Sequence, residues 1–201
     1  SETIEIFHNG CLLTTIKTQL AGIHNVYNTL AVVAALNEAG VELKKLAQYF
    51  YPFTGMGRRF QKVCEFNGIT VYDDYAHHPT EIKAALQAAA SKFGKENVVA
   101  VFQPHRFTRL QSLWKEFLTA FENAGRVIVT DVYAASEDSI EGINGENFAA
   151  ELSCEYVSGN MQDVARKLMP SLKKGDVVIG LGAGTITNLG KELCKLETIL
   201  R

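Results

Sequence analysis

The spacing of apolar and polar residues divides the chain into two parts that predict different architectures. In the first part, Thr3–Phe7 and Leu12–Ile16 are typical of strands, and His8-Asn9-Gly10 lies between them. An Asn-Gly pair between two such segments indicates a β-hairpin. Helical spacing of apolar residues then predicts two helices, over Val26–Ala39 and Glu42–Tyr49.

From about Phe53 onward, segments typical of strands alternate with segments typical of helices. Continuous apolar runs are expected of strands that are buried on both faces. Strands are predicted at Gly68–Tyr72, Val98–Phe102, Val127–Val129, Glu155–Val157 and Asp176–Gly180. Helices are predicted at Ile82–Phe93, Leu110–Phe121, Val164–Met169 and Ile186–Leu196. The alternation predicts a Rossmann-like α/β fold, with a mostly parallel sheet flanked by helices.

The first part is too small to be an independent domain. A hairpin and two helices in about 50 residues bury too little apolar surface to be stable alone. This part therefore either docks on the rest of the chain or forms the end of a larger domain, and we favour the second interpretation. The expected boundaries are residues 1–53 for this part and residues 54–201 for a complete α/β domain.

Composition adds limits on function. Hydrophobic residues make up 47% of the 201 residues and charged residues 21%, as in an ordinary globular protein. The net charge of −2 gives no support for nucleic-acid binding. No apolar run approaches the roughly 20 residues of a membrane-spanning helix, and nothing looks like a signal peptide. We expect a cytoplasmic protein that neither inserts into membranes nor binds nucleic acid.

The cysteines give no sign of a metal site. Cys11, Cys64, Cys154 and Cys194 are scattered, without a C-x-x-C pair. We expect them to be small buried hydrophobic residues in a reducing compartment rather than parts of a disulfide framework.

A polar stretch at residues 73–79 carries two carboxylates, a phenol and two imidazoles where a strand pattern gives way to a helix pattern. Ligands of open α/β sheets bind at this end of the strands, where a carboxylate suits ribose hydroxyl groups. A shared metal ion is disfavoured here, because adjacent residues such as His77 and His78 point in opposite directions on extended backbone. Helix entry accounts for Pro79 but leaves Tyr75 and both histidines unexplained.

A second polar cluster, Gln103–Arg109, follows the next predicted strand. His105, Arg106 and Arg109 would attract a small carboxylate or a phosphorylated group. Arg106 and Arg109 are three residues apart, so they share a face if the segment is helical. The alternative is a pair of ordinary surface ion pairs.

Three further motifs contain glycine. Gly22–Asn28 includes His24, Asn25 and Asn28, whose amides can read an adenine edge, although one helix cap and two solvated side chains would also explain them. His24 or Asn25 is the expected cap.

Gly55–Phe60 places Arg58 and Arg59 after a glycine turn, either for phosphate binding or as an exposed pair at a strand start. Gly180–Thr185 is neither G-x-G-x-x-G nor a P-loop, and the 201 residues contain no P-loop. Its backbone could still approach a polar ligand closely.

In this order, the motifs resemble those of the Mur ligases, which add amino acids to the peptidoglycan precursor. The resemblance covers almost the whole chain and rests on Gly22–Asn28, Phe53–Phe60, Asp73–Ile82, Phe102–Arg109, Asp131–Glu137 and Gly182–Thr185. The 73–82 and 102–109 segments are most similar to the branch that uses L-alanine.

The resemblance implies that residues 1–53 end a central ATPase domain and that residues 54–201 form the C-terminal domain, which binds the amino acid. The family's UDP-sugar domain, P-loop, Mg²⁺ carboxylates and catalytic lysine are not among these residues. The chain is therefore expected to be inactive alone and to hold no cofactor tightly, whereas the complete enzyme would use ATP and Mg²⁺.

The implied reaction belongs to cell-wall synthesis, which supports cell shape and cell division. ATP phosphorylates the carboxylate of UDP-N-acetylmuramate, and the amine of L-alanine attacks the resulting acyl phosphate. Two alternatives remain open: a related ligase that recycles cell-wall tripeptide, and a stand-alone nucleotide-binding module without chemistry.

The resemblance also assigns expected roles to residues. The nucleotide would be bound by His24, Asn25 and Asn28 at adenine, Arg59 at phosphate or ribose, and Asp73 or Asp74 at ribose. The amino acid and acyl phosphate would be surrounded by Tyr75, His77, His105, Arg106 and Arg109. His105 and Arg106 are candidates to stabilise developing charge, and no residue is expected to bind a metal.

Overall fold

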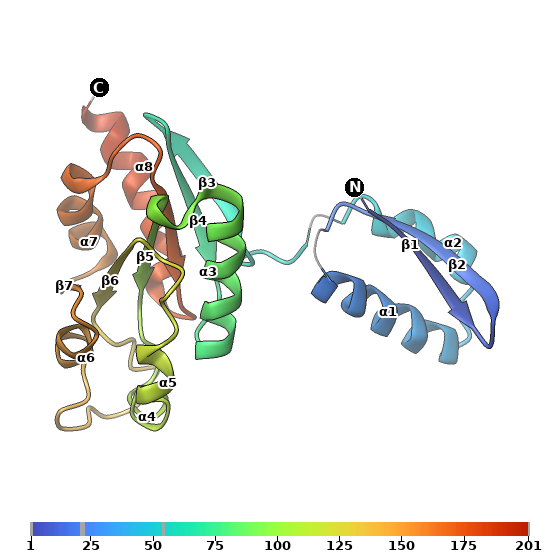
Figure 1. Cartoon of the computed structure of the whole chain (residues 1–201), viewed down its shortest axis with the longest axis horizontal. Coiled ribbons are helices and arrows are strands. Elements are labelled where there is room, and N and C mark those ends of the chain that lie inside the picture. Colours follow the sequence, from blue (N-terminus) through green and yellow to red (C-terminus); the bar gives the residue numbers. More distant parts are fainter. Residues whose placement is uncertain (1, 21–22, 54, 201) are drawn as a thin grey trace. The chain divides into compact units, whose positions relative to one another are not determined.

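The structure is a computed structural model that describes residues 2–20, 23–53 and 55–200. The chain forms two compact units, residues 1–56 and residues 57–201 (Figure 1). Residue 54, where the second predicted domain begins, lies outside the described residues, as do Gly22 of the adenine motif and the side chain of His24.

Unit 1 contains the predicted hairpin and two helices. Strands β1 (Glu2–His8) and β2 (Cys11–Thr18) pair antiparallel. Asn9 and Gly10 form the turn with φ values of 49° and 79°, which suit Asn and Gly and match a two-residue hairpin loop. The helices are α1 (Ile23–Glu38) and α2 (Leu43–Phe50). Because α1 begins at Ile23, the prediction that His24 or Asn25 caps it is wrong.

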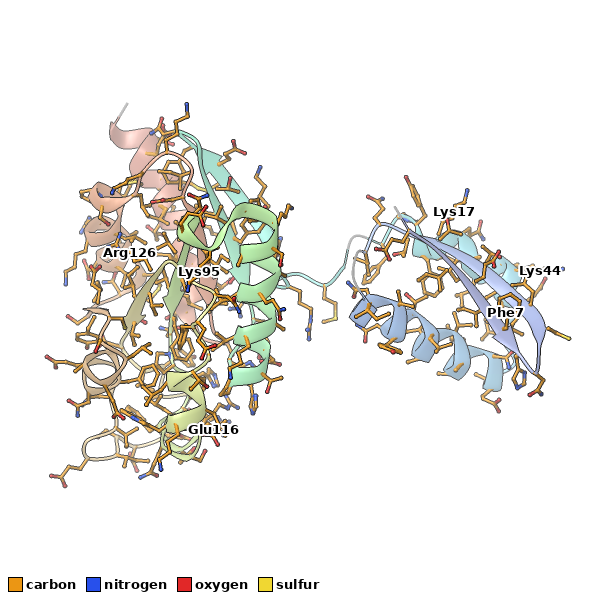
Figure 2. The ribbon with its side chains drawn as sticks, viewed as in Figure 1. Phe7, Lys17, Lys44, Lys95, Glu116 and Arg126 are labelled. Atoms are coloured by element: carbon orange, nitrogen blue, oxygen red, sulfur yellow. A yellow bond between two sulfur atoms is a disulfide. The ribbon has the colours of Figure 1, made fainter. Side chains whose placement is uncertain are left out.

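The core of unit 1 is small. Its buried apolar side chains, among the described residues, are Ile6, Ile16, Val33 and Leu43. Many large apolar side chains are instead exposed, including Phe7 on β1, which Figure 2 labels. The others are Leu12, Ile23, Tyr27, Leu30, Val32, Val41, Tyr49, Tyr51, Phe53 and Met56.

Unit 2 has one sheet of six strands in the order β3-β4-β8-β5-β6-β7. Only β3 runs antiparallel to its neighbour, so the predicted mostly parallel sheet is confirmed. The strands are β3 (Gln61–Phe66), β4 (Ile69–Asp74), β5 (Val98–Phe102), β6 (Arg126–Thr130), β7 (Glu155–Val157) and β8 (Val177–Leu181).

Helices cover both faces of this sheet (Figure 1). Side chains alternate along each strand: Ala100 and Phe102 of β5 face one apolar cluster, and Val99 and Val101 face the other. The first cluster receives α3 (Pro79–Phe93), α4 (Phe107–Ser112), α5 (Trp114–Leu118) and α6 (Gly145–Leu152). The second receives α7 (Met161–Leu168) and α8 (Leu189–Leu200), with short 3₁₀ turns between elements.

Two predicted elements have different boundaries. The single helix expected over Leu110–Phe121 is divided into α4 and α5 at Leu113, whose φ of −115° is not helical. Strand β4 extends through Asp73 and Asp74, which pair in register with Gly180 and Leu181 of β8. These carboxylates therefore belong to the end of a central strand rather than to a loop.

The expectation for the cysteines is wrong for one pair. Cys64 on β3 and Cys194 on α8 form a disulfide across 130 residues of sequence. The reason is the close packing of this helix on the edge strand, where a Cβ at Gly190 would lie 2.9 Å from Val63. Cys11 and Cys154 are free, but Cys11 is exposed on β2, so the expectation that it is buried is also wrong.

Candidate functional site

The polar clusters meet at the carboxyl ends of the three central strands. Strands β4, β8 and β5 are neighbours and parallel, so the segments that leave them emerge at one edge of the sheet. These segments are residues 75–78, 182–185 and 103–106, and the segment after β6 joins them through a bridge between His105 and Tyr133. Two motifs that lie far apart in the sequence thus form one site.

Asp73 is buried in the floor of this site. Its Oδ2 accepts hydrogen bonds from Arg58 Nε at 3.1 Å and Thr187 Oγ1 at 2.7 Å. Arg58 also donates to the carbonyl of Gly182 at 2.7 Å, which ties the turn before β3 to the loop after β8. In the part of the chain that the structure describes, Asp73 Oδ1 is the buried side-chain oxygen left without a hydrogen-bond partner.

The Asp74 carboxylate instead holds two backbone amides in place. Its Oδ2 accepts from the amide of Phe60 at 2.7 Å, and its Oδ1 accepts from the amide of Ala76 at 2.8 Å. Burial raises the pKa of this carboxyl, against the lowering effect of these hydrogen bonds and of Arg59. Both carboxylate oxygens of Asp74 thus bind backbone, one at Phe60 before β3 and one at Ala76 after β4.

The two adjacent arginines differ in environment. Arg58 has a φ of 61°, pairs with Asp73 and lies 4.9 Å from the centre of the Tyr75 ring. Arg59 is exposed. The interpretation of both as an exposed pair is therefore wrong for Arg58, which is held inside unit 2.

His77 and His78 have separate partners, as expected from their adjacent positions. His78 is the N-cap of α3, and its Nδ1 accepts from the amide of Thr80 at 3.3 Å. His77 Nδ1 lies 2.9 Å from the carbonyl of Tyr75 and 3.5 Å from Glu81 Oε2. The capping role accounts for His78, whereas the ring of His77 lies 6.0 Å from that of His105.

His105 is enclosed by cationic and aromatic groups. Its Nδ1 lies 3.1 Å from Arg109 NH1, and its ring stacks on Tyr133 at 5.4 Å. Burial is the main cause that lowers the pKa of His105, and Arg109, His77 and Arg106 lower it further. The neutral imidazole is therefore favoured in the folded chain.

Arg106 points to a different partner. Its NH1 lies 3.7 Å from Glu137 Oε1, and half of its side chain is exposed (50%). Arg106 precedes α4 with a φ of 72°, so the condition under which Arg106 and Arg109 would share a helical face is not met, and Arg109 turns back to His105. Glu137 also accepts from the amide and hydroxyl of Thr108 at 3.1 and 2.7 Å.

The glycines after β8 are needed for packing. A Cβ at Gly182 would lie 2.7 Å from the carbonyl of Gln103, and one at Gly184 would lie 2.6 Å from the Tyr133 ring. The buried amide of Gln103 bonds to the hydroxyl of Thr185 and the amide of Ile186, both at 2.9 Å. Contact between protein segments therefore accounts for these glycines without a ligand.

The segment predicted to read adenine lies in unit 1, where its residues 23–28 form the first turns of α1. Asn28 Nδ2 donates to Asn25 Oδ1 at 3.4 Å. Asn28 is exposed, and the side chain of His24 lies outside the described residues. Within unit 2 the structure brings together the predicted site residues Asp73, Asp74, Tyr75, His77, His105, Arg106 and Arg109.

Sequence reasoning missed three site-forming residues. Glu81, Glu137 and Tyr133 fix His77, Arg106 and His105, respectively. Glu81 had a signal as the third residue of a capping box, and Glu137 and Tyr133 belong to a motif that carried the resemblance. Their contacts depend on the fold and could not be read from spacing.

The described residues offer neither a metal centre nor a membrane span. They contain no group of three or more His, Cys, Asp or Glu side chains that could hold a metal ion. None of their helices is both long and apolar enough to cross a membrane.

Comparison with known proteins decides the family. Residues 58–184 match the family described as Mur ligase, glutamate ligase domain. The chain belongs to the Mur ligase family. The resemblance read from the motifs is thereby confirmed.

Two curated relatives in this family carry the same name. The chain is 47% identical over 184 residues to a UDP-N-acetylmuramate–L-alanine ligase of Caldicellulosiruptor bescii and 41% identical over 204 residues to one of Desulfotalea psychrophila. These alignments cover 89% and 96% of this chain but 40% and 43% of the relatives. The chain thus spans less than half the length of these Mur ligases.

A solved structure agrees with these relatives. The UDP-N-acetylmuramate–alanine ligase of Thermotoga maritima is 28% identical, with a TM-score of 0.72. The match covers 96% of this chain and 42% of that protein.

Proposed function

We propose that this chain supplies the amino-acid-binding part of a cytoplasmic, ATP-dependent ligase that joins L-alanine to UDP-N-acetylmuramate. The main support is the convergence of His77, His105, Arg106 and Arg109 at the sheet edge, in a Mur ligase whose close relatives carry that name. The reaction proceeds through an acyl phosphate of the muramic acid carboxylate.

The two arginines and the neutral His105 suit both reactants as hydrogen-bond donors. Arg106, half exposed at the site, recognises the carboxylate of L-alanine through its guanidinium fork. Arg109 and His105, which are already in contact, stabilise negative charge that develops near the phosphoryl group. Tyr75, which is exposed beside His77, borders the position of the amino acid.

Nucleotide-binding roles are proposed for residues of each unit. His24, Asn25 and Asn28 contact adenine, and the exposed Arg59 reaches phosphate or ribose. Either Asp73 or Asp74 contacts ribose, and the unpartnered Oδ1 favours Asp73, because both oxygens of Asp74 bind backbone amides. The P-loop, the catalytic lysine and the ligands of Mg²⁺ are supplied by other parts of the complete enzyme.

The exposed apolar surface of unit 1 supports the same proposal. A free soluble protein rarely exposes so many large apolar side chains in so few residues. We infer that other segments of the ATPase domain cover them. This chain is then expected to have no ligase activity and no tight nucleotide site alone.

The test is the release of ADP from ATP, UDP-N-acetylmuramate and L-alanine. The complete ligase containing these residues should turn over, and the 201-residue chain should not. In the complete ligase, Arg59→Ala should raise KM for ATP, whereas His8→Ala, at the end of β1, should not. Robust turnover by the 201-residue chain would contradict the proposed dependence on other domains.

Two other functions make different predictions. A tripeptide-recycling ligase would prefer cell-wall tripeptide to L-alanine in the same assay, and the names of the curated relatives favour L-alanine. A stand-alone nucleotide-binding module would bind ADP tightly without chemistry. Calorimetry that showed micromolar ADP binding by this chain would support that module.

A further inference from the structure

The hydrogen bonds of the two facing imidazoles fix their protons on opposite nitrogens. A guanidinium group can donate hydrogen bonds but cannot accept them. Because Arg109 NH1 lies 3.1 Å from His105 Nδ1, this nitrogen must be the acceptor. The neutral His105 ring therefore carries its proton on Nε2 and offers a donor there.

His77 is held in the other tautomer. A backbone carbonyl can only accept, and the carbonyl of Tyr75 lies 2.9 Å from His77 Nδ1. Glu81 Oε2, a second acceptor, lies 3.5 Å from the same nitrogen. His77 therefore carries its proton on Nδ1, and its Nε2 keeps a lone pair that accepts no hydrogen bond from the described residues.

Glu81 is itself held in place. Its Oε2 accepts from the backbone amides of His77 at 3.0 Å and His78 at 3.2 Å. Burial acts to raise the pKa of Glu81, but these hydrogen bonds and the neighbouring histidines outweigh it, so the pKa is lowered. An ionised carboxylate at Nδ1 stabilises an imidazole that gains a proton at Nε2.

We propose that His77 is the base that removes a proton from the amino group of the incoming amino acid, with Glu81 as its positioning residue. This inference rests on the proposed function. The substrate amine is an ammonium group near neutral pH and cannot attack until it loses a proton. His77 alone of the two rings has a lone pair directed away from its protein partners.

The step balances in atoms and charge. The ammonium group gives one proton to His77 Nε2, and its nitrogen lone pair then attacks the acyl carbon. The carbon–nitrogen bond forms, and the carbon–oxygen bond to phosphate breaks with its electron pair leaving on phosphate. The second proton lost by nitrogen goes to that phosphate. His77 returns its proton to water.

The first experiment determines the tautomers in the 201-residue chain, independently of any activity. Long-range ¹H–¹⁵N spectra distinguish protonated from unprotonated ring nitrogens of each histidine. When both rings are neutral, His77 should be protonated on Nδ1 and His105 on Nε2. A His77 protonated on Nε2 would have no free lone pair there and would overturn the proposal.

The second experiment uses the complete ligase with two acceptors. Hydroxylamine traps an acyl phosphate as a hydroxamate and is largely unprotonated at neutral pH, so it needs no base. His77→Asn should slow ligation of L-alanine by about 10²- to 10⁴-fold while hydroxamate formation stays close to wild type. Equal losses with both acceptors, or no loss with either, would overturn the role of His77.

A pH profile separates proton removal from simple binding. The titratable groups that face His77 are Tyr75, Glu81 and His105, with Arg109 behind His105. Raising the pH deprotonates L-alanine itself, so the rate of His77→Asn should approach that of wild type. A constant deficit across pH would indicate a binding role and would contradict the proposal.

Matched variants complete the design. His78→Asn is the control, because His78 caps α3 and Asn is a favourable N-cap, so ligation should be unchanged. Glu81→Gln should lower the L-alanine rate less than His77→Asn and should recover in the same way at high pH. If the wild-type ligase does not use L-alanine at all, the proposed function fails, while the spectra still decide the tautomers.

Discussion

Residues 1–56 and residues 57–201 bury their apolar side chains to very different degrees. Among the described residues, unit 1 exposes eleven large apolar side chains and unit 2 exposes two, although unit 2 is much the longer. Unit 1 has four residues in its buried cluster, whereas the clusters on the two faces of the unit 2 sheet have 18 and 15.

The exposed apolar side chains also lie in different places in the two units. In unit 2 the two are Tyr75 and Tyr133, and both border the candidate site. In unit 1 they occur on both strands and both helices. We interpret exposure in unit 2 as part of the proposed ligand site, and exposure in unit 1 as a surface that other segments of the ATPase domain are proposed to cover.

The largest expected effect is the loss of one unit's fold. Residues 57–201 produced alone should unfold in one cooperative thermal transition, because both faces of their sheet are covered. Residues 1–56 produced alone should show none, because their core is too small. Circular dichroism of both fragments tests this. A sharp transition for residues 1–56 would remove the contrast between the units.

Two substitutions compare the buried core of unit 2 with the exposed apolar surface of unit 1. Phe102→Ala removes a buried ring that packs on Phe117, Phe121 and Phe148, and should cost about 3–5 kcal/mol of unfolding free energy. Urea titration followed by the fluorescence of Trp114, the single tryptophan, measures unit 2.

Leu30→Gln is the counterpart in unit 1, where Leu30 is 44% exposed. It should leave the Trp114 transition within about 0.5 kcal/mol of wild type and should reduce binding of a hydrophobic dye. Unchanged dye binding would indicate that this helix face is not an accessible apolar surface.

Loss of the disulfide is expected to have an intermediate effect on the unfolding free energy of unit 2. Reducing Cys64–Cys194 should lower the unfolding free energy of unit 2 by about 2–4 kcal/mol. Changing Cys11 and Cys154 to Ser should leave this sensitivity to reductant intact. Thiol titration of the unreduced, denatured chain should find two thiols, and four would contradict the disulfide.

The smallest expected effect is a pH dependence of the unfolding free energy of unit 2. The pKa of His105 is lowered by burial and neighbouring cations, so the unfolded chain binds a proton at His105 more readily than the folded chain. Stability should then fall as pH drops through about 6.5 towards the lower folded pKa. Urea midpoints between about pH 7.5 and about pH 5.5 measure this change.

His105→Asn should weaken this pH dependence, whereas His8→Asn, which removes a histidine from unit 1, should not. A steeper loss of stability in His105→Asn than in wild type would mean that His105 is not the group responsible.

Local patterns predicted those parts of the fold that depend on neighbouring residues. Asn9-Gly10 indicated its turn because both residues accept a positive φ, and the apolar run Val98–Phe102 indicated a central strand. The break at Leu113 was not predictable, since apolar spacing continues across it. The extension of β4 to Asp74 was not predictable either, because it depends on pairing with β8 about 100 residues later.

The candidate site likewise has parts that the sequence predicted and parts that it did not. The reactive side chains could be predicted because unusual polar residues follow strand patterns. Their partners could not, since Glu81–His77 and Glu137–Arg106 are pairs that only the folded backbone brings within range. The disulfide is the extreme case, because the spacing of Cys64 and Cys194 has no local signature.

The position of β8 has a consequence for how the protein is made. This strand is the last of the six in sequence, yet it lies between β4 and β5 in the middle of the sheet. While a ribosome is still synthesising the chain, β4 and β5 have no strand to join them until residue 181 has emerged. The sheet of unit 2 is therefore expected to close only after most of its residues have been translated.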